Sequence, residues 1–279
     1  MSWAPSDVSA VVCTLDSIAG IERCLASLRA AGVGELIVVD AGSRDGTRAV
    51  VERMADIVLD DPGTGLGNAR NVGIAVTSGA LVLNMGSDNV MPAGQLERMI
   101  ADLEAEGVQG VSAQTVIEGG DYLSRGLNAW RSGRFRPGPA AVIGTPTLFV
   151  GALLRKHPFD ATRRFSDDSE LCERWARELG ARFVISGAHV LEVGKTSWDE
   201  VIARCRMYGI SDEEVFRIGR DEGWGLARQG RSLLHPARAD FVQPMTRLQP
   251  AEAISSAPFL AAFAGMRYFY WLRTAANRR

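Results

Sequence analysis

Short apolar runs alternate with amphipathic segments along the first part of the chain. Residues 8–13 and 36–39 are largely apolar and end in polar residues, which is typical of strands buried on both faces. Each run is followed by apolar residues at helical spacing, in 21–28 and in 50–54. This alternation predicts an α/β fold with a mostly parallel sheet, right-handed crossovers and helices on its faces.

The same pattern extends the sheet as far as residue 185. Further strands are expected at residues 56–59, 80–84, 110–116, 148–150 and 182–185. From Ser197 onward the pattern is helical. Because 279 residues can form one large domain with an appendage, we expect an α/β domain over residues 1–196 and a helical extension over residues 197–279.

Residues 119–146 interrupt the regular alternation. They hold four arginines among Trp130, Phe135 and several Gly and Pro. A basic stretch with aromatics can bind nucleic acid, but the chain is slightly acidic overall, so no nucleic-acid partner is expected. We predict a flexible lid or acceptor loop, with Trp130 as an acceptor contact, in preference to a solvated connection.

The composition is ordinary for a soluble globular protein, with 46% hydrophobic and 23% charged residues. The net charge of -2 conceals a division: residues 1–203 have 19 basic and 26 acidic side chains, net -7, and residues 204–279 have 12 and 7, net +5. The basic end predicts a surface that faces phosphates or an anionic membrane, although a coding bias toward arginine explains it equally well. Four cysteines without metal-like spacing, and no secretory signal before the first strand, favour a cytoplasmic protein.

Small polar and acidic residues follow three of the predicted strands. Because ligands in open α/β sheets bind where the carboxyl ends of strands meet, we expect Asp40 and Asp88 to belong to one site. Asp40 is placed to accept hydrogen bonds from a base or ribose, while Ser43 or Asp45 caps the next helix. The alternative for Asp88 is that it only stabilises its turn. The other polar residues at these strand ends are Thr14, Asp16, Ser17 and Ser87.

A glycine-rich turn over residues 63–73 runs into another helix. Its backbone N–H groups could bind a phosphate, and the Arg70 guanidinium could add charged hydrogen bonds to the same phosphate. The turn also imitates the dinucleotide fingerprint of a dehydrogenase, because Asp88 lies 21 residues beyond Gly67. Arg70 stands where the third glycine of that fingerprint should be, so a dehydrogenase is the weaker interpretation.

Two further segments carry candidate residues near helices. Ser166 or Asp167 can cap a helix whose buried face includes Leu171 and Trp175, and acids in its first turn suit the helix dipole without any other role. The apolar stretch 258–273 is too short before its first arginine to span a membrane. Its residues at helical spacing predict contact with a membrane surface or a second subunit, and a plain core helix is the alternative. These residues are Phe259, Leu260, Phe263, Met266 and Tyr270.

Taken in order, these pieces resemble family 2 glycosyltransferases of the GT-A fold. The resemblance runs from about Val8 to Val190 and rests on five motifs whose order and spacing make it specific. The motifs are the first strand with Thr14, the segment 39–47, the segment 69–73, the loop 88–92, and Asp167, Asp168, Glu170 and Leu171 with Arg174.

The resemblance implies an inverting transferase that moves a sugar from a nucleotide-diphosphate sugar to a glycan, lipid-linked or small-molecule acceptor. In the family, the acid matching Asp40 helps to hold the base, and the loop matching Asp88 binds the diphosphate through a divalent cation, Mg²⁺ or Mn²⁺. The second acid of a pair before a helix is the catalytic base, which implies Asp168. The helix N-terminus is expected to lower the pKa of this carboxyl. The remaining residues that we place at the donor are Thr14, Asp16, Ser43, Asp45, Gly67, Arg70, Asn71 and Ser87, and those at the acceptor side are Asp167, Glu170 and Arg174.

The sequence departs from the family pattern in two places. The metal loop usually reads Asp-x-Asp, and here Gly86 replaces the first acid. Mg²⁺ commonly takes only one or two protein carboxylates, so Asp88 with diphosphate oxygens can still hold it. A histidine often found after the last strand is missing, and Glu192 falls near that place. Gly86 motivates an alternative function, a catalytically silent relative that binds a nucleotide sugar or a partner.

Overall fold

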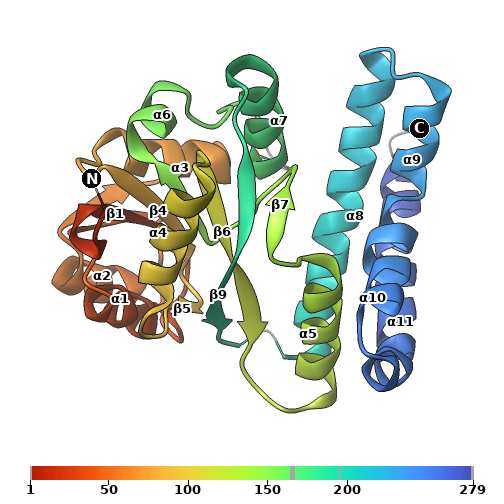
Figure 1. Ribbon diagram of the computed structural model, residues 1–279. Coiled ribbons are helices and arrows are strands. Elements are labelled where there is room, and N and C mark those ends of the chain that lie inside the picture. The colour runs from red at the N-terminus through yellow and green to blue at the C-terminus, as the bar shows by residue number, and fades with distance from the viewer. Residues whose placement is uncertain (1, 164–166, 195, 278–279) are drawn as a thin grey trace. The chain divides into compact units, whose positions relative to one another are not determined.

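The computed structural model describes residues 2–163, 167–194 and 196–277 (Figure 1). The chain forms two compact units. The first unit contains Met1–Val116 and Pro137–Gly194, and the second contains Ile117–Arg136 and Lys195–Arg279. The boundary that we predicted at residue 196 stays a prediction, and the structure adds the segment 117–136 to the C-terminal helices.

The first unit is built on a mixed sheet. In the described residues its strand order is β3-β2-β1-β4-β8-β6-β9-β5, and β7 pairs with β9. The pairs β3–β2, β2–β1 and β1–β4 are parallel, whereas β8 is antiparallel to both β4 and β6. The strands are β1 (Val8–Thr14), β2 (Glu35–Asp40), β3 (Ile57–Asp60), β4 (Leu81–Gly86), β5 (Asn89–Val90), β6 (Gly110–Ile117), β7 (Gly138–Ala140), β8 (Thr147–Val150) and β9 (Phe183–Glu192).

Helices cover both faces of this sheet, which is why its central strands read as continuous apolar runs. Alternate residues of β1 point to opposite faces: Val12 joins the core against α1, α2 and α4, and Val11 joins the core against α3, α6 and α7. The α/β fold predicted from the sequence is therefore confirmed. The helices are α1 (Ile21–Ala30), α2 (Thr47–Met54), α3 (Leu66–Ala75), α4 (Gln95–Glu106), α6 (Gly151–Lys156) and α7 (Asp167–Leu179), after a short 3₁₀ turn, η1 (Pro5–Asp7).

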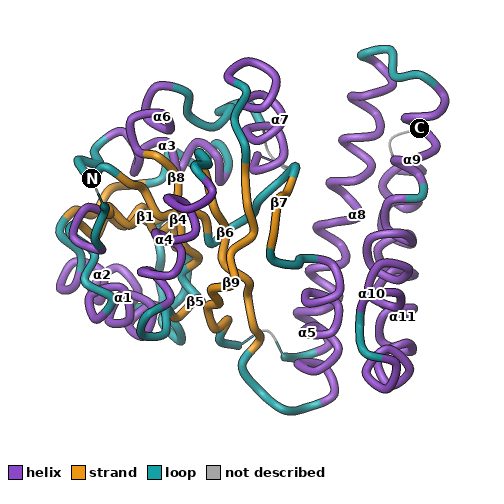
Figure 2. Tube along the Cα trace, in the orientation of Figure 1, coloured by secondary structure: helices purple, strands orange, loops and turns teal. Residues whose placement is uncertain are grey.

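The second unit is helical (Figure 2). Helix α8 begins with a capping box, in which the Ser197 hydroxyl accepts from the Glu200 N–H and the Glu200 carboxylate accepts from the Ser197 N–H. Helix α11 packs along α8 and α5 around a core that includes Leu127 and Phe263. The elements are α5 (Tyr122–Arg134), α8 (Trp198–Asp221), α9 (Leu226–Leu233), a π-helical stretch η2 (Ala237–Val242), α10 (Gln243–Arg247) and α11 (Pro250–Asn277).

The prediction of a flexible lid or acceptor loop over residues 119–146 is wrong, because most of the segment forms α5 and β7. Asp121 caps α5 by accepting from the N–H groups of Leu123 and Ser124, at 2.8 and 3.0 Å. Trp130 is buried, and its indole N–H donates to Asp240 over 2.9 Å. Trp130 is thus a core side chain of the helical unit and not an acceptor contact.

The apolar face that we predicted to meet a membrane or a second subunit is the inner face of α11. Phe259, Leu260 and Phe263 are buried in the core shared with α5 and α8. The alternative of a plain core helix is correct for these residues. No helix among the described residues combines the length and apolarity needed to cross a membrane.

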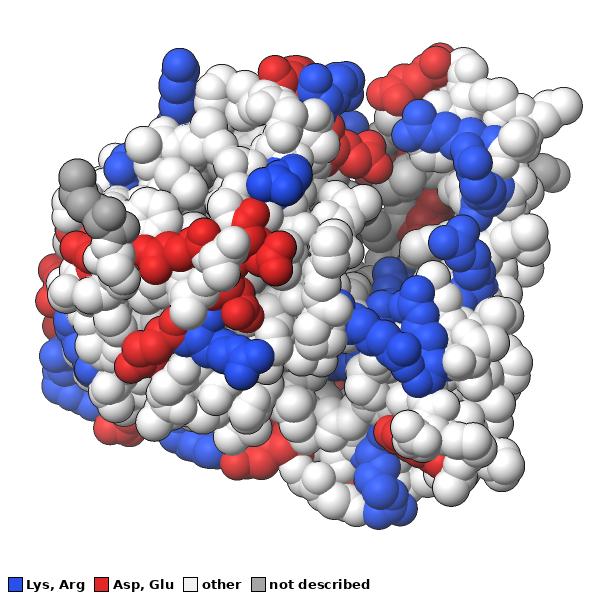
Figure 3. Space-filling model, viewed as in Figure 1, with Lys and Arg blue, Asp and Glu red and all other residues white. Residues whose placement is uncertain are grey.

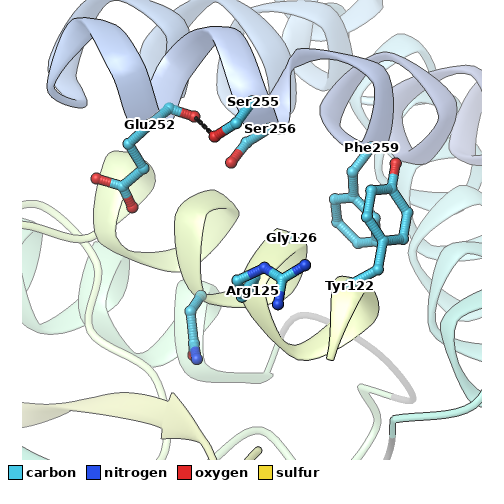
Figure 4. Close-up of a pocket in the computed structure, with 8 residues that line it drawn as sticks. Tyr122, Arg125, Gly126, Glu252, Ser255, Ser256 and Phe259 are labelled. Atoms are coloured by element: carbon cyan, nitrogen blue, oxygen red, sulfur yellow. Dashed lines mark hydrogen bonds between the residues drawn. The ribbon is translucent and has the colours of Figure 1, made fainter. Parts of the chain in front are cut away.

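The approach of α5 to α11 depends on Gly126 (Figure 4). A Cβ at this position would lie 2.4 to 2.6 Å from the ring of Phe259, whereas a Cβ at Gly265 would meet nothing within 4 Å. The two elements also enclose a cavity of about 260 Å³ in the helical unit. It is lined by Tyr122, Arg125, Gly126, Asn128, Glu252, Ser255, Ser256 and Phe259.

We expect Gly126→Ala to lower the Tm and Gly265→Ala to raise it. Alanine gains up to about 1 kcal/mol over glycine in a helix, but overpacking a buried ring costs about 1 to 3 kcal/mol. Both glycines are helical and lie in the same unit, so Gly265→Ala is the matched control. Calorimetry that shows equal increases in Tm for both variants would contradict the described contact between α5 and Phe259.

Candidate active site

Three loops at the carboxyl ends of β1, β2 and β4 are joined by hydrogen bonds. The N–H of Asp16 donates to the Ser43 hydroxyl over 2.9 Å, and its carboxylate accepts from the Arg44 N–H over 2.8 Å. The hydroxyls of Ser17 and Ser87 are 3.0 Å apart. The structure therefore brings together the strand ends that the parallel pairing led us to expect.

Asp45 holds the start of α2 from outside the helix. Its carboxylate accepts from the hydroxyl and N–H of Thr47, at 2.6 and 3.0 Å, and from the Ile18 N–H at 2.9 Å. These bonds, led by that of the Thr47 hydroxyl, lower the pKa of Asp45. The N-cap position itself is Gly46, so the prediction that Ser43 or Asp45 occupies it is wrong.

Asp40 is buried at the end of β2 and shapes its own loop. Its Oδ1 accepts from the Ser43 hydroxyl over 2.5 Å, and its Oδ2 accepts from the Ser43 N–H over 3.2 Å. The Arg48 guanidinium lies 3.7 Å from the same Oδ2. The predicted contact of Asp40 with a base or ribose stays a prediction, and the structure shows a carboxylate that orders the β2 loop.

The loop after β4 places two oxygens over Gly86. A Cβ at Gly86 would lie 2.8 Å from Asp88 Oδ1 and 2.8 Å from Asn89 Oδ1. Side-chain oxygens are the ligands that Mg²⁺ and Mn²⁺ prefer. Among the described residues, no group of three or more His, Cys, Asp or Glu could hold a metal ion. The loop therefore offers a cation two side-chain oxygens, those of Asp88 and Asn89, and further ligands would have to come from a bound phosphate or water.

A buried cation holds the two acids at the start of α7. Nη1 of Arg70 lies 2.7 Å from Asp167 Oδ2 and 3.0 Å from Asp168 Oδ1, and Nη2 donates to the Thr145 hydroxyl over 2.6 Å. Burial by itself would lower the pKa of Arg70, but the Asp168 and Asp167 carboxylates outweigh it and raise the pKa. Arg70 is the counterion of these carboxylates in the structure, and its predicted contact with a phosphate stays a prediction.

Asp168 combines access with a raised pKa. Its side chain remains 25% exposed. Burial of the rest raises the pKa to about 6, while Arg70 opposes the increase and the Asp167 charge adds to it. Our expectation that the helix N-terminus lowers this pKa is wrong, because desolvation dominates. The predicted cap at Ser166 lies outside the described residues.

Two donor-side candidates order the chain beside these acids. A Cβ at Gly67 would lie 3.2 Å from Asp167 Cβ, so this glycine lets α3 approach the start of α7. The Asn71 amide donates to the Phe159 carbonyl over 2.8 Å and accepts from its N–H over 3.0 Å. Both residues serve contacts within the protein, and the phosphate binding predicted for the backbone N–H groups of residues 63–73 stays a prediction.

Two acceptor-side candidates form an ion pair within α7. The guanidinium Nε of Arg174 lies 2.6 Å from Glu170 Oε1, and Nη2 donates to the Pro158 carbonyl over 2.6 Å. The pair fastens the segment before α7 to the helix, and this is the role that the structure shows for both residues.

Sequence reasoning missed Thr145 and two buried polar side chains. Thr145 lies in the segment predicted to be a lid, and no sequence pattern indicates it as a partner of Arg70. Asn84 and Thr147 are register partners on β4 and β8. Their side-chain polar atoms, and the Thr14 hydroxyl, are buried without a hydrogen-bond partner among the described residues. An unpaired buried polar group is costly, so these side chains are candidate contacts for a polar ligand.

Comparisons with known proteins identify the family. The sequence model of glycosyl transferase family 2 matches residues 9–163. The succinoglycan biosynthesis protein ExoO of Rhizobium meliloti is 36% identical over 109 residues, covering 37% of this chain and 31% of that protein. Glycosyltransferase AglE of Haloferax volcanii is 28% identical over 111 residues, covering 36% of each. The match thus spans about a third of the length of these curated relatives.

Solved structures share the fold. The mannosyltransferase PcManGT of Pyrobaculum calidifontis, solved with GDP-Man and Mn²⁺, has a TM-score of 0.59 at 20% identity, covering 98% of this chain and 84% of that one. TarS of S. aureus, residues 1–349 with UDP-GlcNAc, has a TM-score of 0.56 at 16% identity, covering 97% and 91%. At these identities the likeness shows the fold alone. Because the family model covers more than half of the sequence, this chain belongs to glycosyl transferase family 2.

Proposed function

We propose that this chain is an inverting glycosyltransferase that moves a sugar from a nucleotide-diphosphate sugar to an acceptor hydroxyl. The observation that carries the proposal is the partly exposed Asp168 carboxylate, held by the buried Arg70 in the same unit as the strand-end loops. Such a group can remove a proton from a substrate. The donors seen in the related folds, UDP-GlcNAc and GDP-Man, support a nucleotide sugar as substrate.

The donor is assigned to the loops after β1, β2 and β4. These loops are joined through Asp16, Ser43 and the Ser17–Ser87 pair, so they present one surface to a ligand. Asp88, with the Asn89 oxygen beside it, would hold Mg²⁺ or Mn²⁺. When bound, the cation supplies positive charge that stabilises the departing diphosphate. PcManGT, which was solved with Mn²⁺, supports this assignment.

We expect Gly86→Ala to weaken Mn²⁺ binding in the presence of UDP while leaving the Tm nearly unchanged. The added Cβ must displace the oxygens of Asp88 and Asn89, which are the ends of flexible side chains, so the backbone can stay in place. Misplacing groups that orient a metal ligand costs about 10- to 100-fold in affinity. Calorimetry measures the Mn²⁺ affinity, with Gly230→Ala, which meets nothing within 4 Å, as the control.

Restoring the family acid gives the sharper outcome. Gly86→Asp carries the same Cβ, so we expect it to bind Mn²⁺ no better than the parent. If Gly86→Asp instead binds Mn²⁺ more tightly than the parent, the cation does not require the Asp88 carboxylate to lie where the structure places it, beside Gly86. That result would contradict the assignment of the metal site.

The chemistry assigned to Asp168 is a single proton transfer. The acceptor oxygen forms a bond to the anomeric carbon on the face opposite the diphosphate, as the bond from that carbon to the diphosphate oxygen breaks. The hydroxyl proton passes to Asp168, and the electron pair of the broken bond leaves with the nucleoside diphosphate. Arg70 fixes the carboxylate through Oδ1, and Asp167 shares that guanidinium.

The pH profile should report the raised pKa. A base must be deprotonated, so kcat/KM should fall tenfold for each pH unit below an apparent pKa near 6 and level off above it. Because the Asp167 charge raises the pKa of Asp168, Asp167→Asn should move this limb to lower pH. Initial rates across a pH series, measured for both proteins, provide the test. A profile that stays flat down to pH 4, the usual range of an aspartate, would contradict a base whose pKa is raised to about 6.

Two steps test the proposed function against the silent relative that Gly86 suggests. Thermal shift with a panel of nucleotide sugars, with and without Mn²⁺, identifies the donor. Release of nucleoside diphosphate from that donor then separates an enzyme from a protein that only binds it. Glycan, lipid-linked and small-molecule acceptors are all supplied in this assay. If the protein binds the donor but releases no nucleoside diphosphate, it is a binding protein and not a transferase.

A further inference from the structure

Exposed apolar side chains concentrate in the C-terminal part of the described chain. Seven of the seventeen exposed large apolar residues lie within residues 225–277, about a fifth of the sequence. Leu226, Ile254 and Leu272 are 85%, 73% and 69% exposed, and only Leu234 among the others comes close. Scattered exposed apolar residues need no explanation, but this density does.

The outward face of α11 has no charge for most of its length. Between Glu252 and Arg273 the only charged residue of the helix is Arg267, which is buried and paired with Asp212 and Asp240. The exposed residues from 254 to 272 span about 28 Å at 1.5 Å per residue. A helix that is apolar on every side is normally covered on every side. These exposed residues are Ile254, Ser255, Pro258, Ala261, Ala262, Gly265, Phe269 and Leu272.

Helix α9 is a short amphipathic helix without a buried residue. Leu226 and Leu233 lie on one face with Leu234 just beyond the helix end, and Arg228 and Arg231 lie on the other. Its end is fixed to α11 because the Tyr268 hydroxyl donates to the Leu233 carbonyl over 2.7 Å. Tyr268 is next to Phe269 and one turn from Leu272, so the end of α9 is fixed to the part of α11 that carries these two residues.

Most of the exposed charged side chains of residues 225–277 are basic. Among residues 225–277, five exposed arginines stand against a single exposed acid, Glu252, because Asp240 is buried. Figure 3 shows basic side chains, with some acidic ones, on the face of the helical unit that it presents. The exposed arginines are Arg228, Arg231, Arg238, Arg247 and Arg273.

We propose that α9 and the outward face of α11 lie on the surface of an anionic phospholipid membrane. Leucine and phenylalanine side chains enter the boundary between headgroups and acyl chains, and the arginines contact lipid phosphates. The contact is interfacial, since no described helix is suited to span the bilayer. The proposal uses the face of α11 opposite to Phe259 and Phe263, and it does not depend on the proposed catalytic function.

Charge favours a lipid surface over a second copy of the chain. A symmetric dimer would place the same surface on both subunits, so arginines would face arginines with only Glu252 to offset them. An anionic membrane attracts the same arginines, at about fivefold in affinity for each one near the surface.

The test is sedimentation of the full chain with vesicles. The parent should bind vesicles of phosphatidylcholine with added phosphatidylglycerol and bind pure phosphatidylcholine much less. Phe269→Ser with Leu272→Ser should weaken binding by at least about tenfold per side chain. Arg231→Gln with Arg273→Gln should weaken it by about fivefold per arginine and reduce its dependence on salt.

Matched controls come from the first unit. Leu179→Ser, and Arg53→Gln with Arg177→Gln, change exposed residues of the same kinds and should bind vesicles as the parent does. Nucleotide binding by calorimetry should be parental in every variant, so this test and that of the proposed function can fail separately. A parent that ignores anionic vesicles overturns the proposal. So does a parental dimer that Phe269→Ser with Leu272→Ser converts to a monomer without loss of vesicle binding.

Discussion

Replacing Asp168 with asparagine is expected to lower kcat by about 10²- to 10⁴-fold, the usual contribution of a general base. Asparagine keeps the size of the side chain but cannot take the acceptor proton. Donor affinity should stay nearly intact, because Asp168 lies at the start of α7 and not on the strand-end loops. Initial rates at saturating donor measure kcat, and calorimetry measures the affinity.

Asp167→Asn is the matched control. It also removes one carboxylate from Arg70, but it leaves the proposed base in place. Its kcat should therefore exceed that of Asp168→Asn by at least about tenfold, because it keeps a base whose usual contribution is about 10²- to 10⁴-fold. An Asp168→Asn enzyme with the kcat of the parent would refute the assignment, and Asp167 and Glu170 would then be the carboxylates to examine.

Asp88→Ala should abolish donor binding that depends on Mn²⁺. Asp88 is the acidic residue on the loop after β4, and Gly86 stands where the family has a second acid. No other carboxylate on that loop can therefore substitute for Asp88 in the variant. Titration of the donor with and without Mn²⁺, in the parent and in the variant, measures the difference. If Asp88→Ala binds donor and Mn²⁺ as the parent does, the metal assignment is wrong.

Asp40→Ala separates the two ends of the donor site. It should weaken binding of the free nucleotide without Mn²⁺, because Asp40 orders the β2 loop through Ser43. The dependence of donor binding on Mn²⁺ should remain. Equal losses in both variants, with and without the cation, would indicate general damage to the sheet edge.

The sequence was most informative where local pattern and burial agree. Residues 36–39 read as a buried strand because helices cover both faces of β2, and α1 shows its buried face as Ile21, Leu25 and Leu28. The strand-end loops followed from parallel pairing alone. The proposed catalytic pair at Asp167 and Asp168 came from the family resemblance, since acids in a first helical turn have an ordinary structural role.

Helix α5 shows how a local signal can mislead. Leu123, Leu127 and Trp130 have helical spacing, but the arginines and glycines among them favoured a loop. In the structure the glycines serve close packing: a Cβ at Gly133 would lie 2.4 Å from the Pro244 Cα. That contact joins positions more than 100 residues apart, so no local sequence pattern indicates it.

The raised pKa of Asp168 was beyond sequence reasoning for the same reason. It depends on burial by residues distant in the sequence, and it persists although Arg70, which lies 98 positions earlier in the chain, opposes it. The helix dipole is local and visible in the sequence, whereas desolvation depends on the tertiary fold. Desolvation has the stronger effect on this carboxyl, and the sequence does not display it.

Inversion at the anomeric carbon can be observed by proton NMR even before the acceptor is known. With an α-linked nucleotide-diphosphate sugar and water as acceptor, the sugar that first accumulates should be the β-anomer, since attack opposite the diphosphate inverts the centre. Asp168→Asn should release the same anomer at a rate lower by about 10²- to 10⁴-fold. A first product with the α configuration, formed at parental rate by Asp168→Asn, would contradict both the inverting mechanism and its base.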